Sequence, residues 1–210
     1  AAWATFGPWA RLTMPQRARR LVKLAAVMRR RREELAAWLV FEASKNYLEA
    51  IADVAEAIDF CEYYARESLL LAGPARTYHY PGEENTSFYQ PIGAGVVIPP
   101  WNFLLAILVG TAVAPVVVGN TVVVKPSPST PIIASVFMHC VAEAGFPPGV
   151  INLLTGADAD LGDALVDHPR TRFVNFTGSV TTGLRINERA AKVNPGQKWL
   201  KRVFLEMGGK

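Results

Sequence analysis

Residues 96–125 read VVIPPWNFLLAILVGTAVAPVVVGNTVVVK, and this stretch decides the fold. The β-branched run Val96–Ile98 stops at two prolines, which lack the N–H group that continues a strand ladder. An apolar segment over residues 103–118 follows, and a Gly-Asn turn leads into a second apolar strand over residues 121–125. A strand, a helix and a strand in this order predict a βαβ unit, whose two strands are parallel neighbours.

Two polar residues, Asn102 and Lys125, interrupt these apolar stretches just past the carboxyl ends of the two strands. Ligands of open α/β sheets bind outside these ends. The Asn102 amide can donate to a developing oxyanion, or it can cap the helix that follows. Lys125 can reach a ribose hydroxyl or a phosphate, or it can be a surface lysine whose stem lies along the protein. Taken alone, the residues favour the cap for Asn102 and leave both interpretations of Lys125 open.

The alternation of helices and strands continues to the end of the chain. After residue 125 the pattern predicts helices over residues 130–145, 158–166 and 177–193 and strands over residues 150–154, 172–176 and 202–206. Pro131 in the first turn and Gly145 after the last turn mark the ends of the first of these helices. From residue 95 onward the chain therefore predicts an α/β fold built on a doubly wound parallel sheet.

The residues before this sheet have a different character. Residues 1–14 look irregular and aromatic, whereas apolar spacing predicts one helix over residues 15–39 and a second over residues 48–67. Residues 74–92 alternate on either side of a Pro-Gly turn, which predicts a projecting β-ribbon that pairs with another element or another subunit. The predicted domains are a helical part packed on the sheet domain (1–73), the ribbon (74–92) and the sheet domain (93–210).

Composition and charge limit the class of protein. Half of the 210 residues are apolar and 19% are charged, so the chain is globular rather than disordered. The formal net charge of +4 permits an anionic ligand but does not require nucleic acid. The first long helix carries a basic face with Arg17 and the run Arg29–Arg32. We interpret it as a solvated face rather than a nucleic-acid or membrane patch, because no aromatic or Gly/Ser residues interleave with the charges.

The cysteines indicate a reducing compartment, and the histidines and apolar runs indicate neither a metal site nor a membrane span. Cys61 and Cys140 lie far apart and three histidines are scattered, so neither a disulfide framework nor a metal site is expected. The longest apolar run contains Gly110 and Pro115 and is short for a membrane span. We expect a cytoplasmic protein without metal, membrane or nucleic-acid partners. Because the sequence opens with Ala-Ala-Trp and stops directly after a strand, we also expect a fragment of a longer chain.

Two further motifs lie at predicted strand ends. Phe176-Thr177-Gly178-Ser179 runs from a strand into a helix whose free amides and dipole would face an anion, although a Ser N-cap explains the same residues. The spacing is not GxGxxG, so the standard dinucleotide fingerprint is absent. Glu206 ends a predicted buried strand and precedes two glycines. Burial would raise the pKa of Glu206 and suit it to general-base catalysis, whereas the alternative is an ion pair, for example with Lys210.

Together these motifs resemble the signatures of the NAD(P)-dependent aldehyde dehydrogenase superfamily, over essentially the whole chain. They are Pro100-Trp101-Asn102-Phe103, the segments 119–127 and 145–150, Phe176-Thr177-Gly178-Ser179 and Glu206-Met207-Gly208-Gly209-Lys210. Within that superfamily, residues 81–85 and 195–202 are most similar to those of 1-pyrroline-5-carboxylate dehydrogenases, which oxidise glutamate γ-semialdehyde to glutamate in proline breakdown. The resemblance implies NAD as the cofactor, NADP as a further candidate, an aldehyde substrate and a homo-oligomer of two or more subunits.

The resemblance also implies a reaction and a role for each site residue. A cysteine-bound hemithioacetal would transfer a hydride to NAD(P), and water would then hydrolyse the acyl-enzyme. Asn102 would donate to the oxyanion, Glu206 would activate the water, and Phe103 would border the aldehyde tunnel. Residues 74–92 would form the oligomerisation ribbon. The implied cofactor-binding residues are Lys125 at the adenosine ribose, Gly178 and Ser179 at the pyrophosphate, Gly156 and Gly162 on the adenine side, and Pro100, Trp101, Ser127, Phe176, Met207 and Gly208.

Three departures from the family pattern limit what the resemblance implies. Leu104 replaces the Pro that often follows Asn-Phe, and Pro128 replaces the Glu that often grips the ribose 2′-hydroxyl, which weakens a strict preference for NAD over NADP. The nucleophilic cysteine of the family lies downstream of the glutamate motif, and neither Cys61 nor Cys140 matches its position. We therefore expect this piece to be inactive alone. The alternatives are an enzyme for succinate semialdehyde or an aliphatic aldehyde, or a member of the fold without catalysis.

Overall fold

The computed structural model describes residues 1–156 and 158–208, with the backbone alone over residues 158–160. Among these residues, five parallel strands form one sheet in the order β3-β2-β1-β4-β5. The strands are β1 (Ala94–Ile98), β2 (Thr121–Val124), β3 (Ile151–Leu153), β4 (Phe173–Gly178) and β5 (Arg202–Met207). The doubly wound parallel sheet is therefore confirmed.

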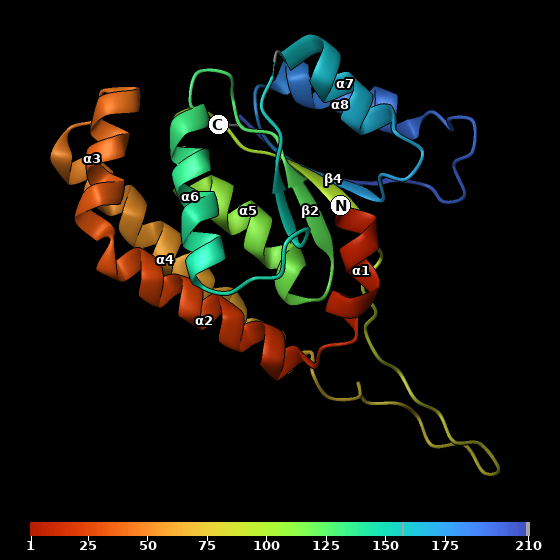
Figure 1. Cartoon of the computed structure of the whole chain (residues 1–210). Coiled ribbons are helices and arrows are strands. Elements are labelled where there is room, and N and C mark those ends of the chain that lie inside the picture. The colour runs from red at the N-terminus through yellow and green to blue at the C-terminus, as the bar shows by residue number, and fades with distance from the viewer. Residues whose placement is uncertain (157, 209–210) are drawn as a thin grey trace.

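Helices cover both faces of this sheet (Figure 1). The helices α5 (Ala106–Val117) and α6 (Pro131–Glu143) pack on one face, and α7 (Asp158–Asp167) and α8 (Val180–Ala191) pack on the other. The larger buried cluster joins β1 and β2 to α5, α6 and the N-terminal helices, and the smaller joins β4 to α7 and α8. The central strands are thus buried from both sides, as parallel strands require.

The order of the strands creates a crevice at one edge of the sheet. The chain runs outward from β1 through β2 and β3 and then returns to place β4 and β5 on the other side of β1. Pairing of Val97 with Val124 and of Ile98 with Phe176 brings the carboxyl ends of β1, β2 and β4 to the same edge. Ligands of open α/β sheets bind at such a switch point, so the segments that follow these strands form the candidate site.

The N-terminal region is more helical than its sequence predicts. The start of the chain is not irregular, because α1 (Ala2–Ala10) is a helix whose buried Trp9 donates its indole N–H to Val116 O at 2.9 Å. The single helix predicted over residues 15–39 is also wrong, since α2 (Met14–Arg30) and α3 (Arg32–Ala43) are separate. The break at Arg31 lets α3 pack against α4 (Tyr47–Leu70) and α6. It carries neither Gly nor Pro, so no sequence signal marks it.

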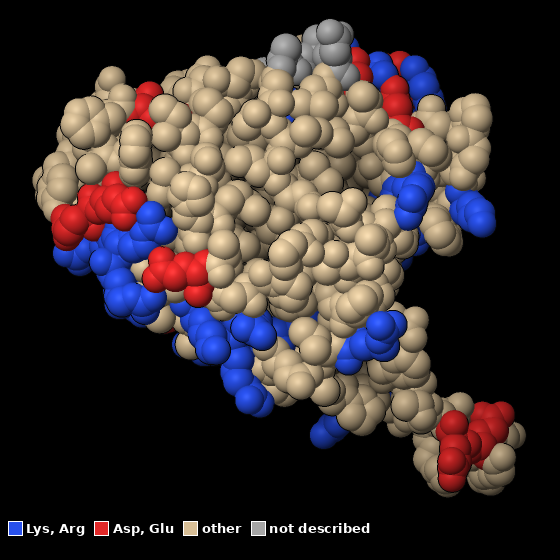
Figure 2. All heavy atoms as spheres, viewed as in Figure 1, with Lys and Arg blue, Asp and Glu red and all other residues tan. Residues whose placement is uncertain are grey.

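The basic face of α2 is only partly solvated. Arg17 contradicts the prediction because it is buried, and its Nε donates to Val117 O at 2.7 Å at the end of α5. Burial lowers the pKa of the Arg17 guanidinium. Further along the helix, Arg29 forms an exposed ion pair with Glu62 at 2.6 Å, and acidic and basic side chains lie side by side over this region in Figure 2. These pairs support the interpretation of the remaining face as a solvated surface.

Residues 74–92 project from the body of the molecule (Figure 1). One isolated antiparallel bridge joins Ala75 to Ser87, and this described segment contains no regular strand. Its aromatic side chains are open to solvent, with Tyr78 82% and Phe88 63% exposed. The predicted projection is present, although its ladder is reduced to one bridge. The role of the ribbon and the division into domains stay predictions.

Two kinds of feature are missing from the described part of the chain. None of its helices has both the length and the apolar character needed to cross a membrane. Within the same residues, no three His, Cys, Asp or Glu side chains are grouped so that they could hold a metal ion. The two cysteines, Cys61 and Cys140, are free and buried.

Candidate functional site

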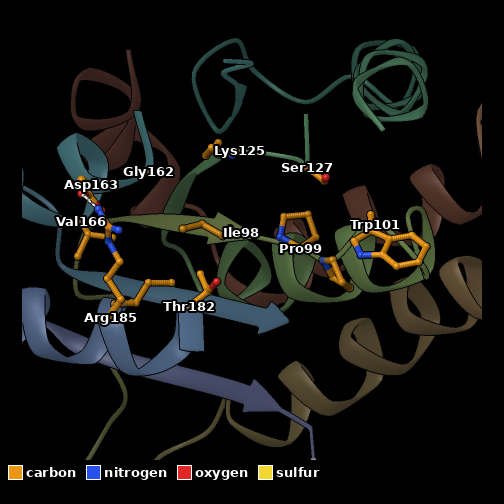
Figure 3. Close-up of a pocket in the computed structure, with 12 residues that line it drawn as sticks. Ile98, Pro99, Trp101, Lys125, Ser127, Gly162, Asp163, Val166, Thr182 and Arg185 are labelled. Atoms are coloured by element: carbon orange, nitrogen blue, oxygen red, sulfur yellow. Dashed lines mark hydrogen bonds and ion pairs between the residues drawn. The ribbon is translucent and has the colours of Figure 1, made fainter. Parts of the chain in front are cut away.

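A pocket of about 300 Å³ opens at the carboxyl ends of β1 and β2, with α7 and α8 as its walls (Figure 3). Its lining residues are Ile98, Pro99, Pro100, Trp101, Lys125, Ser127, Gly162, Asp163, Val166, Thr182, Arg185 and Ile186. The cofactor-binding residues predicted from the sequence that meet here are Pro100, Trp101, Lys125, Ser127 and Gly162. The pocket therefore gathers residues from four separate segments of the chain.

Lys125 is the buried polar residue of this pocket, with 1% of its surface exposed. It directly follows β2, and its backbone N–H donates to Val97 O at 2.8 Å, which fixes its position beside β1. Its ammonium donates to Pro126 O at 3.2 Å. This burial contradicts the surface-lysine interpretation, because such a side chain keeps its charge in water.

Ser179 is the N-cap of α8. Its hydroxyl oxygen accepts from Thr182 N at 3.3 Å, and its hydroxyl group donates to the Thr182 hydroxyl at 2.9 Å. Thr182 also lines the pocket, so the capped first turn of α8 stands at the pocket wall. The cap interpretation is confirmed, whereas a contact between Ser179 and a pyrophosphate stays a prediction.

Glycines at two positions leave room for the side chains of Phe176 and Met207 at this end. A Cβ atom at Gly178 would lie 2.6 Å from the Phe176 ring, and one at Gly183 would lie 2.3 Å from Met207 Sδ. Both distances are too short for real carbon contacts, so a larger residue at either position would displace the Phe176 or the Met207 side chain. Of these residues, Phe176, Gly178 and Met207 are predicted cofactor contacts, and the structure places them beside the pocket rather than in its lining.

The two glycines predicted on the adenine side differ from each other. Gly162 lines the pocket, and a Cβ atom there would have open space around it. Gly156 lies outside the lining, and a Cβ atom there would approach Leu161 to 2.8 Å. Gly208, at the end of β5, also lies outside the lining. Only Gly162 is therefore placed where it could contact a ligand of this pocket directly.

An ion-pair ladder joins α7 to α8 at the wall of the pocket. Arg185 Nε donates to Asp163 Oδ1 at 3.2 Å, and Arg189 Nη1 lies 3.1 Å from Asp163 Oδ2. Arg185 and Asp163 point toward each other in Figure 3. The hydrogen bond to Asp163 raises the pKa of Arg185, so the pair stays charged. The ladder thus joins the two helices that form the walls of the pocket.

Glu206 is exposed, which contradicts the burial predicted from its apolar strand. Its strand, β5, is last in the sheet order, and its side chains alternate between exposed and half-buried. Phe204 on the same face is 55% exposed. Glu206 therefore lacks the desolvation on which the general-base argument depended, and its catalytic role stays a prediction. The alternative partner, Lys210, lies outside the described residues.

Asn102 and Phe103 are exposed in the irregular segment between β1 and α5. The Asn102 Oδ1 atom accepts from Phe103 N at 3.1 Å. Asn102 does not cap α5, because the helix begins after Leu105 and its first N–H, from Ala106, donates to the Asp53 carboxylate at 2.6 Å. The capping interpretation of Asn102 is therefore wrong. The structure does not place Asn102 or Phe103 in the pocket lining.

Most residues of the pocket walls were not predicted from the sequence. Val166 and Ile186 are buried apolar residues, and they lie four residues after Gly162 and Thr182, which line the same pocket. Residues at this spacing share one face of a helix. The spacing is thus a signal that could have found these residues once both helices were placed against the sheet.

Comparison with known proteins places the chain in a family. The sequence model of the aldehyde dehydrogenase family matches residues 1–210. The chain belongs to the aldehyde dehydrogenase family. This confirms the resemblance found in the motifs. Among curated members, the chain is 56% identical over 205 residues to 1-pyrroline-5-carboxylate dehydrogenase of Geobacillus kaustophilus, covering 98% of this chain and 40% of that protein.

Other relatives extend this similarity. The Bacillus subtilis 1-pyrroline-5-carboxylate dehydrogenase is 52% identical over 210 residues, which is 100% of this chain and 41% of that protein. A Thermus 1-pyrroline-5-carboxylate dehydrogenase solved with bound NAD has a TM-score of 0.98 and 53% identity, covering 100% of this chain and 41% of that chain. Proline utilization A from Bdellovibrio bacteriovorus has a TM-score of 0.96 and 45% identity, covering 99% of this chain and 22% of that chain. The chain spans about 40% of the length of the curated relatives it matches.

Proposed function

We propose that this aldehyde dehydrogenase chain is the cofactor-binding part of an enzyme that oxidises glutamate γ-semialdehyde to glutamate with NAD. The observation that carries the proposal is the buried Lys125 in the crevice pocket, on a chain 56% identical to a 1-pyrroline-5-carboxylate dehydrogenase. The similar Thermus enzyme was solved with bound NAD, which supports NAD as the cofactor.

The residues of the pocket fit a dinucleotide. Ile98, Val166 and Ile186 supply apolar surface for a flat ring, and Lys125 and Ser127 supply donors for ribose hydroxyls. The first-turn amides and the dipole of α8 suit an anionic pyrophosphate. When bound there, NAD would supply the acceptor for a hydride from the substrate.

Residues outside the pocket would assist the chemistry. Asn102 donates a hydrogen bond from its amide NH₂ group to the substrate oxygen as negative charge develops on it. Glu206 removes a proton from the water that releases the acid product. Phe103 presents its ring to the carbon chain of the aldehyde. All three side chains are exposed in this chain, so a substrate or a water molecule can reach them.

Three further parts of the proposal concern cofactor range, assembly and compartment. Pro128 cannot repel a 2′-phosphate as a glutamate would, so we propose that NADP is also used. The exposed aromatic residues of the ribbon 74–92 support its use in a homo-oligomer. The free, buried Cys61 and Cys140 support a cytoplasmic location.

The test is an assay of the full-length enzyme that contains this chain. NADH formation is followed at saturating NAD with glutamate γ-semialdehyde, succinate semialdehyde and an aliphatic aldehyde. We expect kcat/KM to be highest for glutamate γ-semialdehyde. A higher value for either other aldehyde would overturn the substrate assignment, and NAD binding without turnover of any aldehyde would indicate a member of the family that has lost catalysis.

A further inference from the structure

Two carboxylates from the N-terminal helices cap the helices that follow the candidate site loops. Asp53 of α4 is 2% exposed, and its Oδ1 atom accepts from the N–H of Ala106, the first residue of α5, at 2.6 Å. Glu42 of α3 accepts from Ile132 N at 2.6 Å and from Ile133 N at 2.8 Å, in the first turn of α6. Both contacts join residues that are far apart in the sequence.

Neither α5 nor α6 is capped by its own N-cap side chain. The N-cap residues are Leu105 and Thr130, and neither makes a side-chain capping hydrogen bond. The first amides of a helix need acceptors, and a carboxylate placed there also interacts favourably with the helix dipole. The N-terminal helices therefore supply what the local sequence lacks, and they do so at the end of each loop that leaves the sheet.

The contact at α5 is reinforced by a lysine. Lys45 Nζ donates to Asp53 Oδ2 at 2.6 Å, so each carboxylate oxygen of the buried Asp53 has a partner. The same Nζ atom lies 4.9 Å from the centroid of the Phe103 ring, within the range of a cation–π contact. One ion pair thus holds both the start of α5 and the residue next to Asn102.

We propose that Asp53 and Glu42 are positioning residues for two different parts of the site. Asp53, with Lys45, sets the loop 99–105, which carries Asn102, and Glu42 sets the loop 125–130, which carries Lys125. Each loop is held by its strand at one end and by a carboxylate of the N-terminal helices at the other. The inference rests on the proposed function, because it takes the roles of Asn102 and Lys125 from it.

The proposal predicts that two matched substitutions in the full-length enzyme change different quantities, one kcat and the other the Kd for NAD. Asp53→Asn and Glu42→Gln each keep the shape of the side chain and remove its charge. Asp53→Asn should lower kcat about tenfold while the Kd for NAD stays within about twofold, since a shifted loop misplaces Asn102. Glu42→Gln should raise the Kd for NAD about three- to tenfold while kcat at saturating NAD stays within about twofold.

Two additional variants separate positioning from folding. The double variant Asp53→Asn with Lys45→Met removes both charges of the buried ion pair together, along with the cation beside Phe103, so it should lower kcat without changing NAD affinity. Glu62→Gln removes the exposed ion pair between α2 and α4, which touches neither loop, and should change neither quantity. Thermal unfolding of every variant reports its global stability. If Asp53→Asn does not fold, the double variant carries the test of the first loop, because it leaves no buried charge of that pair without a partner.

The results distinguish failure of this inference from failure of the proposed function. NAD affinity is measured by calorimetry, without turnover, and kcat is measured with whichever aldehyde the wild-type enzyme oxidises best. Equal losses of kcat and NAD affinity in both matched variants would overturn the division of roles, as would no change in either. A wild-type enzyme that binds no NAD would overturn the proposed function instead.

Discussion

Replacing Lys125 by methionine should weaken NAD binding without weakening the fold. The lysine is 1% exposed, and methionine is an unbranched side chain of similar length that can occupy the same space. Under the proposed function, the change removes one charge-assisted hydrogen bond to the cofactor, which is worth about 1.5–3 kcal/mol. That loss corresponds to a rise in the Kd for NAD of about tenfold to about 150-fold.

Stability should change little. Methionine removes the cost of burying an ammonium, but it also leaves the partners of that ammonium, Pro126 O among them, without their donor. These two effects oppose each other, so the Tm of Lys125→Met should stay close to that of the wild-type protein. This separates a binding effect from partial unfolding, which would lower the Tm and the affinity together.

Isothermal titration of NAD into the full-length enzyme measures the affinity, and quenching of Trp101, a pocket residue that is 64% exposed, gives a second signal. Lys192→Met is the matched control. Lys192 is an exposed lysine whose Nζ lies 3.1 Å from Oε1 of Glu188 on α8, and it does not line the pocket. An affinity for NAD within about twofold of wild type in Lys125→Met would remove Lys125 from the cofactor site. Equal losses in both variants would show a general effect of charge.

Three other measurements test separate parts of the argument. Steady-state kinetics should show turnover with NADP, because Pro128 carries no charge that repels a 2′-phosphate; no detectable NADP turnover would show that another group excludes it. Glu206→Gln should keep the first burst of NADH and lower steady-state turnover by about two to four orders of magnitude, whereas loss of the burst would place Glu206 at an earlier step. Burial raises the pKa of Cys61 in the folded protein, so the stability contributed by its neutral thiol is complete below the ordinary thiol pKa and is lost as the pH rises past it. Urea unfolding should show a steeper loss of stability between about pH 8 and pH 10 in wild type than in Cys61→Ala, and equal slopes would refute this.

Periodic apolar patterns predicted the sheet domain well. Runs such as Thr121–Val124 are buried from both sides, so their sequence carries the signal of the strand directly. The break at Arg31 and the burial of Arg17 could not be predicted, because both depend on where distant helices pack. Arg17 donates to the backbone carbonyl of Val117, and no sequence signal near residue 17 predicts that contact.

Some residues of the site could likewise be predicted from the sequence, and others could not. Lys125 could be placed at the site because it lies at the end of a predicted strand, whereas Ser127 was named only because the family resemblance implied it. Glu206 lies near the end of a strand too, but apolar residues alone cannot distinguish a central strand from the last strand in the sheet order, so its burial was predicted wrongly. The capping role of Asp53 could not be predicted, because its partner on α5 lies 53 residues away in the sequence.

The shared core has a consequence for how the chain reaches its fold during synthesis. Apolar residues of α2 and α4, such as Leu24 and Val54, belong to the same buried cluster as Val113 of α5 and Phe137 of α6. When a ribosome has released α4, the helices that complete this cluster have not yet been made, and at about 5–20 residues per second their arrival takes several seconds. The N-terminal helices then expose apolar surface that a chaperone can recognise. The N-terminal helices therefore cannot bury their apolar surface in this cluster until α5 and α6 have been synthesised.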